Sequence, residues 1–207
     1  EQQIIKDFAH SKFVVCTDAG LSSFQNRCFN NKANRAFITT QSIKKLKSYL
    51  KEWCLDTHGW YAEGFNNDFD ISSLQNDETL IEKYKNTIFF KERWINENGL
   101  EQKLIVTFSL KYKNYQHQIR NRQIDRAKKL IELNPNDIKK CNQNDYKRFV
   151  KKTSVTADGK LASLDVFDIN MDIIAKEELY DGFYPVCTNL QYDATENTKI
   201  NHNRWEI

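Results

Sequence analysis

The stretch Phe13-Val14-Val15-Cys16-Thr17-Asp18-Ala19-Gly20 decides the fold of this chain. A short apolar run that ends in a carboxylate and a glycine is typical of a buried parallel strand, which brings an acid to the carboxyl edge of a sheet. This edge is where open α/β sheets bind their ligands. We therefore expect an α/β fold with Asp18 at the edge of its sheet.

The residues that follow predict a compact βαβ unit. Ser22 or Ser23 can cap a helix over about 24–30, and residues 35–39 predict a second short strand. A crossover between parallel strands is expected to be right-handed. A further helix over 43–53, capped by Ser42, is then expected to face the sheet.

Beyond residue 60 the pattern predicts strands and one long basic helix. Strands at 87–94 and 102–112 are expected to form a hairpin, because apolar residues alternate along 102–112 and the turn-forming residues 96–99 separate the two strands. The next segment, about 115–133, predicts a polar helix that ends at Asn134-Pro135. Asp158-Gly159 is a strong signal for a second hairpin.

The last part of the chain is expected to return to the first unit. The span 171–179 fits a strand or a helix, and the apolar run 183–188 predicts a strand. We expect residues 1–60 to form the first part of a core, 61–178 a β-rich insertion with the basic helix, and 179–207 the return to the core.

Composition describes a soluble globular protein that is mildly basic. The 207 residues are 40% hydrophobic and 29% charged, with a net charge of +3. The longest apolar runs are too short to cross a bilayer, and no signal peptide is visible. An odd number of scattered cysteines favours a reduced, cytosolic protein. Cys54 and His58 have metal-like spacing, but no second pair completes a tetrahedral zinc site.

Basic residues gather in two places, along the predicted long helix and shortly after it. The candidate DNA contacts among them are Lys111, Lys113, Arg120, Arg122, Arg126, Lys129, Lys147, Arg148 and Lys151. Such side chains bind DNA phosphates without reading the base sequence. The alternative is a solvated helix face, and the residues alone do not separate the two.

Asp18 is the candidate metal ligand of the chain. Mg²⁺ prefers oxygen ligands and usually takes one or two protein carboxylates. An aspartate at the end of a strand can instead cap a helix or close a turn, and this alternative stays open.

Three sequence blocks in order resemble DDE-type insertion-sequence transposases, specifically the group with a tyrosine, arginine, glutamate and lysine signature. Residues 14–23 with 35–39 resemble the second-aspartate block of that family. Residues 179–189, which include Asp181-Gly182-Phe183-Tyr184, resemble the strand before its glutamate helix. Residues 111–133 are similar to the insertion between these blocks.

The resemblance implies an RNase H-like core, interrupted by a β-rich insertion, in which three acids hold two Mg²⁺ or Mn²⁺ ions for phosphodiester cleavage and strand transfer. Asp18 matches the second aspartate, and Arg204 matches the signature arginine. The first aspartate and the glutamate would lie outside the chain, the glutamate directly after Ile207, so we expect a fragment that is inactive alone. Asn201 stands where the signature has tyrosine. Glu206 lies about 200° around a helix from Arg204 and is not expected to replace the glutamate.

The partners implied by the resemblance are double-stranded DNA, as transposon ends and target, and a second copy of the full-length protein. The implied location is the cytosol and nucleoid, with no membrane. Two rival hypotheses remain. A non-catalytic nucleic-acid-binding module predicts that Asp18 lies far from Arg204, whereas a small nucleotide-binding α/β enzyme is disfavoured because the chain lacks a Gly-rich phosphate loop.

Overall fold

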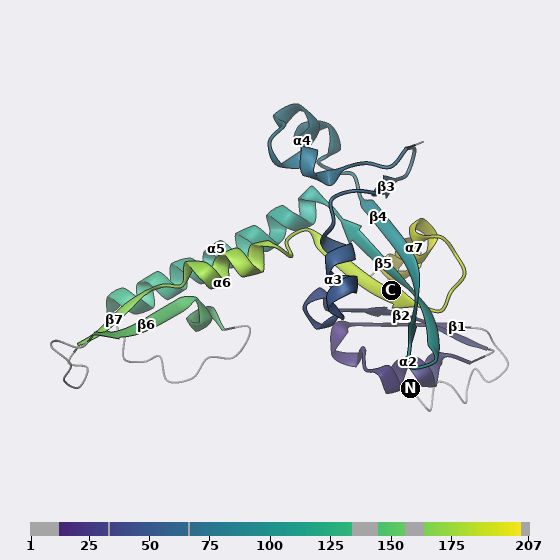
Figure 1. Ribbon diagram of the computed structural model, residues 1–207, viewed down its shortest axis with the longest axis horizontal. Helices are drawn as coiled ribbons and strands as arrows, with labels where there is room; N and C mark the ends of the chain where they lie inside the picture. Colours follow the sequence, from purple (N-terminus) through teal and green to yellow (C-terminus); the bar gives the residue numbers. More distant parts are fainter. Residues whose placement is uncertain (1–12, 33, 66, 134–144, 156–163, 204–207) are drawn as a thin grey trace. The chain divides into compact units, whose positions relative to one another are not determined.

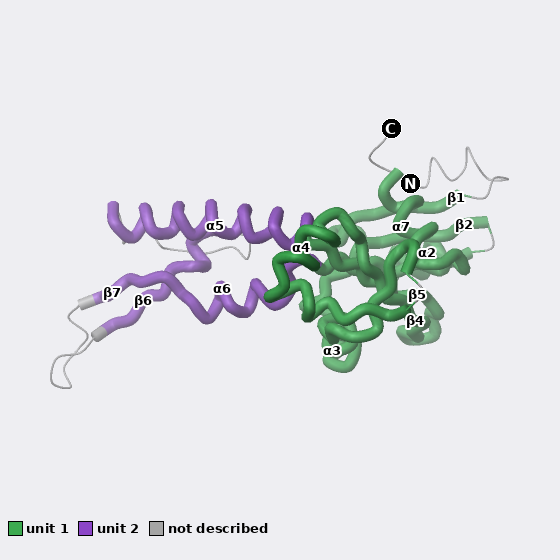
Figure 2. The backbone as a smooth tube through the Cα atoms, turned by 90° about the horizontal axis from the view of Figure 1, so that it is seen from above, with its two compact units in different colours: residues 1–110, 183–207 green, residues 111–182 purple. Residues whose placement is uncertain are grey.

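The structure is a computed structural model that describes residues 13–32, 34–65, 67–133, 145–155 and 164–203 (Figure 1). The fold is mixed α/β, with a six-stranded sheet, a separate two-stranded hairpin and six α-helices among these residues. The chain forms two compact units, which are unit 1 (residues 1–110 and 183–207) and unit 2 (residues 111–182) (Figure 2). None of the described helices combines the length and the apolar character needed to cross a membrane. The α/β class predicted from the sequence is confirmed.

The six-stranded sheet belongs to unit 1. Its strands lie in the order β1 (Phe13–Thr17), β2 (Arg35–Thr40), β8 (Phe183–Thr188), β5 (Leu100–Phe108), β4 (Phe89–Glu97) and β3 (Tyr61–Ala62). β1 and β2 are parallel, and every other neighbouring pair is antiparallel. The sheet is therefore built from one short parallel pair extended by an antiparallel set.

The parallel pair is the predicted βαβ unit, with α2 (Phe24–Asn30) between β1 and β2. Ser23 caps α2, because its Oγ accepts a hydrogen bond from the backbone N–H of Asn26 at 3.2 Å. Residues 43–53 were expected to form one helix, but they form a 3₁₀ turn, η2 (Ile43–Lys45), and a separate helix, α3 (Ser48–Leu55). The interruption falls at Leu46 and Lys47, whose ψ angles of 156° and 149° are extended rather than helical.

The predicted hairpin of β4 and β5 is present, with a turn of two residues. Asn98 and Gly99 have φ angles of 50° and 87°, which is the turn geometry that matches the twist of paired strands. The side chain of Asn96 accepts a hydrogen bond from the N–H of Gly99 at 3.0 Å. The prediction that the second strand continues to residue 112 is wrong, because α5 (Leu110–Leu133) begins two residues after β5 ends.

The two faces of the sheet are covered by different helices (Figure 1). On one face, α7 (Ala194–Asn203) contributes Ala194 and Ile200 to a core cluster with Ile38, Ile105 and Val186. The other face carries α2 and α3. There, Arg27 of α2 donates a hydrogen bond to Gln102 of β5, and Lys91 of β4 donates to the carbonyl of Trp53 in α3. Each face can therefore hold a pocket of its own.

The remaining elements of unit 1 surround an aromatic cluster. They are η3 (Ile71–Gln75) and α4 (Glu78–Tyr84), whereas the turn η1 (Ala19–Leu21) follows β1 at the other end of the sheet. The rings of Phe65, Phe69 and Tyr84 contact the fully buried Phe89 at centroid distances of 4.9–6.0 Å. This packing connects the segment after β3 to the sheet.

Unit 2 consists of most of α5, the turn η5 (Tyr146–Phe149), the hairpin of β6 (Val150–Val155) and β7 (Leu164–Ile169), and α6 (Met171–Glu178). Its buried core is formed by Ala127, Phe149 and Ile174. The span 171–179, for which the sequence left strand and helix both open, therefore forms the helix α6. The predicted turn at Asp158-Gly159 lies outside the described residues.

The limits of the two units differ from the domain limits expected from the sequence. Residues 61–178 were expected to form the insertion, but β4 and β5 belong to the main sheet. β5 pairs with β8 from Lys103 opposite Thr188 to Phe108 opposite Phe183. This long-range pairing places the division at residues 110/111 and 182/183.

Candidate functional site

Asp18 directly follows β1, where β2 runs beside it. The hydroxyls of Thr17 and Thr39 share a hydrogen bond of 2.6 Å and connect the ends of the two strands. The N–H of Leu21 donates to the carbonyl of Asp18 at 2.9 Å and closes η1. The Asp18 side chain is exposed, and its carboxylate makes no capping hydrogen bond to η1. The carboxylate therefore does not serve as the cap of this turn.

Asp18 lines a pocket of about 530 Å³ on the sheet face that α7 covers. β2, β5, β8 and α7 supply the polar side chains around it, namely Thr40, Thr107, Tyr184, Thr198, Asn201 and His202. The hydroxyls of Thr40 and Tyr184 lie 2.6 Å apart and share a hydrogen bond. The pocket thus combines one carboxylate with hydroxyl, amide and imidazole groups.

Asn201 is the most buried of the polar residues that α7 gives to this pocket. Its side chain is 7% exposed, and its Oδ1 atom has no hydrogen-bond partner within the described residues. A buried acceptor without a donor costs free energy. This oxygen is therefore suited to accept a hydrogen bond from a group bound in the pocket.

The start of α7 is held firmly by local hydrogen bonds. The Asp193 carboxylate accepts from the N–H of Glu196 at 2.8 Å. The fully buried Asn197 donates through Nδ2 to the carbonyls of Tyr192 and Asp193 at 2.6 and 2.9 Å. Together with Ala194 in the core, these contacts determine where the last turn of α7 lies. That turn brings His202 to the Asp18 pocket.

Arg204, the second predicted catalytic residue, lies outside the described residues, as does Glu206. The predicted meeting of Asp18 and Arg204 therefore stays a prediction. His202 lies two positions before Arg204 in the sequence and lines the same pocket as Asp18.

The described residues do not by themselves form a metal centre. Among them, no group of three His, Cys, Asp or Glu side chains is arranged to hold a metal ion. Asp18 is the one carboxylate that lines its pocket within this part of the chain. A two-metal site needs several carboxylates, so the described residues of this pocket would supply only one of them.

Two of the nine predicted DNA contacts are used inside unit 2 instead. Arg120 is 4% exposed and donates to both oxygens of the buried Asp181, at 2.8 and 2.6 Å. Burial alone would lower the pKa of Arg120, but the hydrogen bonds and the charge of Asp181 raise it above its ordinary value. Arg148 donates to Glu177 at 2.8 and 3.0 Å and to Gln123 at 2.8 Å. We therefore correct their assignment as phosphate contacts, because both guanidinium groups are committed to internal partners.

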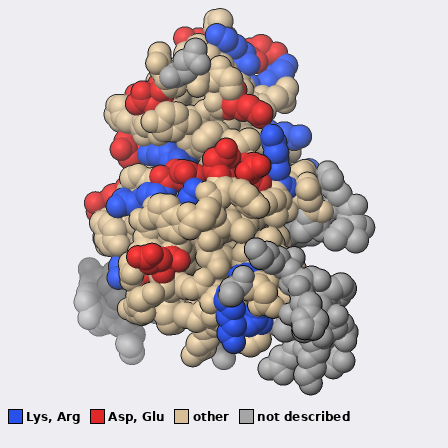
Figure 3. Space-filling model, turned by 90° about the vertical axis from the view of Figure 1, so that its right-hand side faces the viewer, with Lys and Arg blue, Asp and Glu red and all other residues tan. Residues whose placement is uncertain are grey.

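The other predicted contacts keep accessible positions in unit 2. Lys113 of α5 and Lys147 of η5 are half-buried. The exposed residues are Lys111, Arg122, Arg126 and Lys129 on α5 and Lys151 on β6. By contrast, basic and acidic side chains of the described residues are intermixed on the face drawn in Figure 3. The exposed face of α5 is therefore the better candidate for a phosphate-binding surface.

Sequence reasoning had not identified Thr40, Thr107 or Tyr184 as pocket residues. The alternation along β8 offered one signal, because Tyr184 shares a face with the core residue Val186. Comparisons of the chain with known protein families, curated proteins and solved structures find no match.

Proposed function

We propose that this chain forms part of the RNase H-like catalytic core of a DDE-type DNA transposase. The observation that carries the proposal is that Asp18 and the last turn of α7 line one pocket. In the family that the sequence resembles, the second aspartate and the glutamate helix belong to one catalytic site. Asp18 matches the aspartate by sequence, and α7 begins the segment that would carry the glutamate.

The edge of the sheet gives further support. Among the described strands, β1 pairs only with β2 and therefore stands at the end of the described sheet. The resemblance puts the first aspartate of the family on an earlier strand. A strand added beside β1 would bring that aspartate close to Asp18.

The proposed role of Asp18 is to supply one carboxylate to bound Mg²⁺ or Mn²⁺. Such ions stabilise the attacking and leaving oxygens of a phosphodiester in an in-line displacement. The resemblance puts the other two acids outside residues 1–207. We therefore expect these residues alone to bind DNA without cutting it.

The proposed DNA surface is the exposed basic face of α5. Arg122, Arg126 and Lys129 follow one another at spacings of four and three residues, which places them on one side of a helix. Side chains of this kind neutralise phosphates and release counterions, so the affinity falls as the salt concentration rises. Lys151 on β6 adds a further cation within unit 2.

DNA binding is tested by fluorescence anisotropy with a labelled duplex over a series of salt concentrations. The salt slope is the steepness with which the logarithm of the binding constant falls against the logarithm of the salt concentration, and each phosphate contact that is lost should reduce it by about 0.9. We expect the double variant Arg122→Ala/Arg126→Ala to reduce it by about 1.8, by the same rule. The control Lys44→Ala/Lys83→Ala removes the same charge from exposed positions of unit 1 and should leave the slope unchanged. An equal reduction in the control, or no binding by the parent chain, would contradict the proposal.

Catalysis is tested with the protein extended at both ends by its flanking coding sequence. Nicking of DNA that carries transposon ends should require Mg²⁺ or Mn²⁺ and should disappear in Asp18→Asn. Asp68→Asn, which neutralises another exposed carboxylate of unit 1, should nick normally. Nicking that persists in Asp18→Asn would refute the catalytic role and favour the rival hypothesis of a non-catalytic nucleic-acid-binding module.

A further inference from the structure

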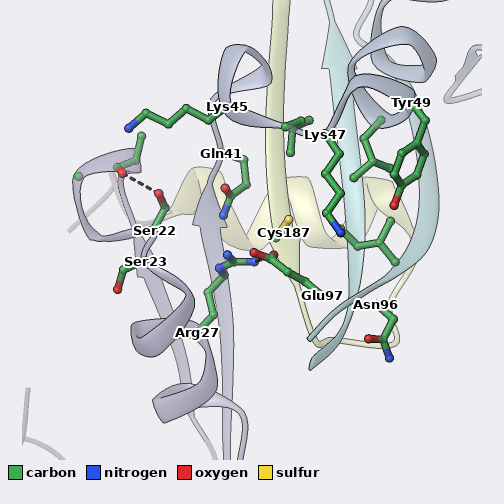
Figure 4. A pocket seen from close by; sticks show the side chains of 15 residues that line it. Ser22, Ser23, Arg27, Gln41, Lys45, Lys47, Tyr49, Asn96, Glu97 and Cys187 are labelled. Atoms are coloured by element: carbon green, nitrogen blue, oxygen red, sulfur yellow. Dashed lines mark hydrogen bonds and ion pairs between the residues drawn. The ribbon is translucent and has the colours of Figure 1, made fainter. Parts of the chain in front are cut away.

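A second pocket in unit 1, with a volume of about 390 Å³, lies on the sheet face that carries α2 and α3 (Figure 4). Cys187 lines this pocket, whereas its neighbour Val186 lines the Asp18 pocket. Successive residues of a strand point to opposite faces, so the sheet separates the two pockets. Ala19, the first residue of η1, is the residue they share. The second pocket is therefore distinct from the candidate catalytic one.

The floor of this pocket is a hydrogen-bonded network around Glu97. Arg27, which is 6% exposed, donates to the carboxylate of Glu97 at 2.7 Å and to the side-chain oxygen of Gln102 at 2.9 Å. Gln102 in turn donates to Glu97 at 3.0 Å. The hydrogen bond from Arg27 is the main cause that holds the pKa of Glu97 below its ordinary value. The one carboxylate of the pocket is thus ionised and already partnered.

Two buried donors in the pocket are left without partners in the described residues. They are Nε of Arg27 and Nε2 of Gln41. Figure 4 shows the Gln41 amide and the Arg27 guanidinium pointing toward the same part of the pocket, and Lys47 extending into it from the other side. With Lys45 at the rim, three cations line a pocket that holds one carboxylate. The surplus of donors and of positive charge favours an anionic ligand.

Tyr49 adds an aromatic surface at the mouth of this pocket. Its side chain is 52% exposed and lies beside Lys47 (Figure 4). An exposed tyrosine ring can stack on a nucleobase. The volume of the pocket is also within the range of small-molecule sites.

We propose that this pocket binds a phosphate-bearing ligand the size of one nucleotide. The phosphate accepts hydrogen bonds from Lys47 and Gln41, and the base stacks on Tyr49. The ligand is either a free nucleotide or a nucleotide of a DNA strand, because both present the same groups. The site does not depend on the proposed cleavage reaction.

The test is a calorimetric titration of the 207-residue chain with deoxyadenosine monophosphate. Lys47 is exposed, so Lys47→Ala should fold normally, and it should weaken binding about tenfold by removing one charged hydrogen bond. Gln41→Leu should weaken binding as well. Lys44→Ala removes the same charge from an exposed neighbour outside the pocket and should change the affinity less than twofold. Equal effects of Lys47→Ala and Lys44→Ala, or no binding at millimolar nucleotide, would overturn the proposal.

Further titrations locate the ligand and identify its source. Tyr49→Ala should weaken the binding of the nucleotide but not the binding of inorganic phosphate. In the parent chain, phosphate should bind more weakly than the nucleotide. Asp18→Asn should leave the nucleotide affinity unchanged, even if the transposase hypothesis fails. Loss of binding in Asp18→Asn, or equal affinity for phosphate and nucleotide, would overturn the proposal. A single-stranded tetranucleotide that binds as tightly as the mononucleotide would support a DNA strand as the source, and weaker binding would support a free nucleotide.

Discussion

Replacing Arg120 with alanine is expected to loosen unit 2. The two hydrogen bonds from Arg120 to Asp181 are 2.8 and 2.6 Å long, and the side chains are only 5% and 7% exposed. The substitution leaves the Asp181 carboxylate buried without its cation. Removing one partner of a buried ion pair costs about 3–5 kcal/mol. The second contact of Arg120, with the half-exposed Glu178, adds little because water screens it.

This cost is measured by hydrogen exchange with mass spectrometry. A loss of about 3 kcal/mol increases local opening roughly 150-fold, so amides of α5 should exchange about two orders of magnitude faster in Arg120→Ala. Amides of β5 serve as an internal reference in unit 1. Arg122→Ala, an exposed substitution on the same helix, should leave exchange unchanged.

The double variant Arg120→Met/Asp181→Leu distinguishes two costs: that of leaving one charge buried without a partner, and that of losing the ion pair itself. It removes both charges and should restore slow exchange, because apolar residues can replace a buried pair at little cost. If Arg120→Ala and Arg122→Ala exchange alike, the buried pair does not stabilise unit 2 and the reasoning is refuted.

Three further predictions concern unit 1. The hydrogen bond from Arg27 lowers the pKa of Glu97, so Glu97 contributes stability that is present above its unfolded pKa and is lost as the pH falls through its folded pKa. The urea concentration at half-unfolding, followed by tryptophan fluorescence, should therefore decrease as the pH is lowered below about 4.5. This decrease with pH should be less steep in Glu97→Gln, and equal steepness in the two proteins would contradict the prediction. Lys91→Met removes hydrogen bonds of 3.1 and 2.7 Å to two carbonyls near the end of α3 and should lower the free energy of unfolding by about 1–3 kcal/mol. An unchanged urea midpoint would count against that role. Burial raises the pKa of Cys187 to about 12, whereas Cys28 is exposed, so iodoacetamide at a pH of about 8 should label Cys28 first in peptide mass spectra. Equal labelling rates would contradict the burial of Cys187.

Features that depend on a few neighbouring residues could be predicted from the sequence. Asn98-Gly99 tolerates two positive φ angles, and the structure has a two-residue turn there. Ser23 was one of two candidate caps and does cap α2. Asp18 lies at the predicted end of its strand, because an apolar run followed by a polar turn marks such an end locally.

The start of α5 could not be predicted from apolar alternation. The pattern of Leu104, Val106 and Phe108 continues through Leu110 and Tyr112, although the strand ends at Phe108. The two-residue repeat of a strand and the 3.6-residue repeat of a helix fit such a short continuation equally well. Ser109, a residue type common at helix N-caps, was the one local signal for the change.

Burial of Arg120 depends on a partner that is distant in the sequence. A run of basic residues suggests a solvated helix face, but Arg120 shares its side of α5 with the core residues Ile124 and Ala127. Its partner Asp181 is 61 residues away. The same limit applies to the candidate site, where Thr40 and Tyr184 are 144 residues apart in the chain.

The pairing of Phe108 with Phe183 has a consequence for how such a chain can change in evolution. Residues 109–182 leave and re-enter the sheet at adjacent ends of two hydrogen-bonded strands. A segment whose ends meet in this way can be exchanged for a short turn without rethreading the strands on either side. Gains, losses and replacements of this segment can therefore accumulate while the sheet keeps its register.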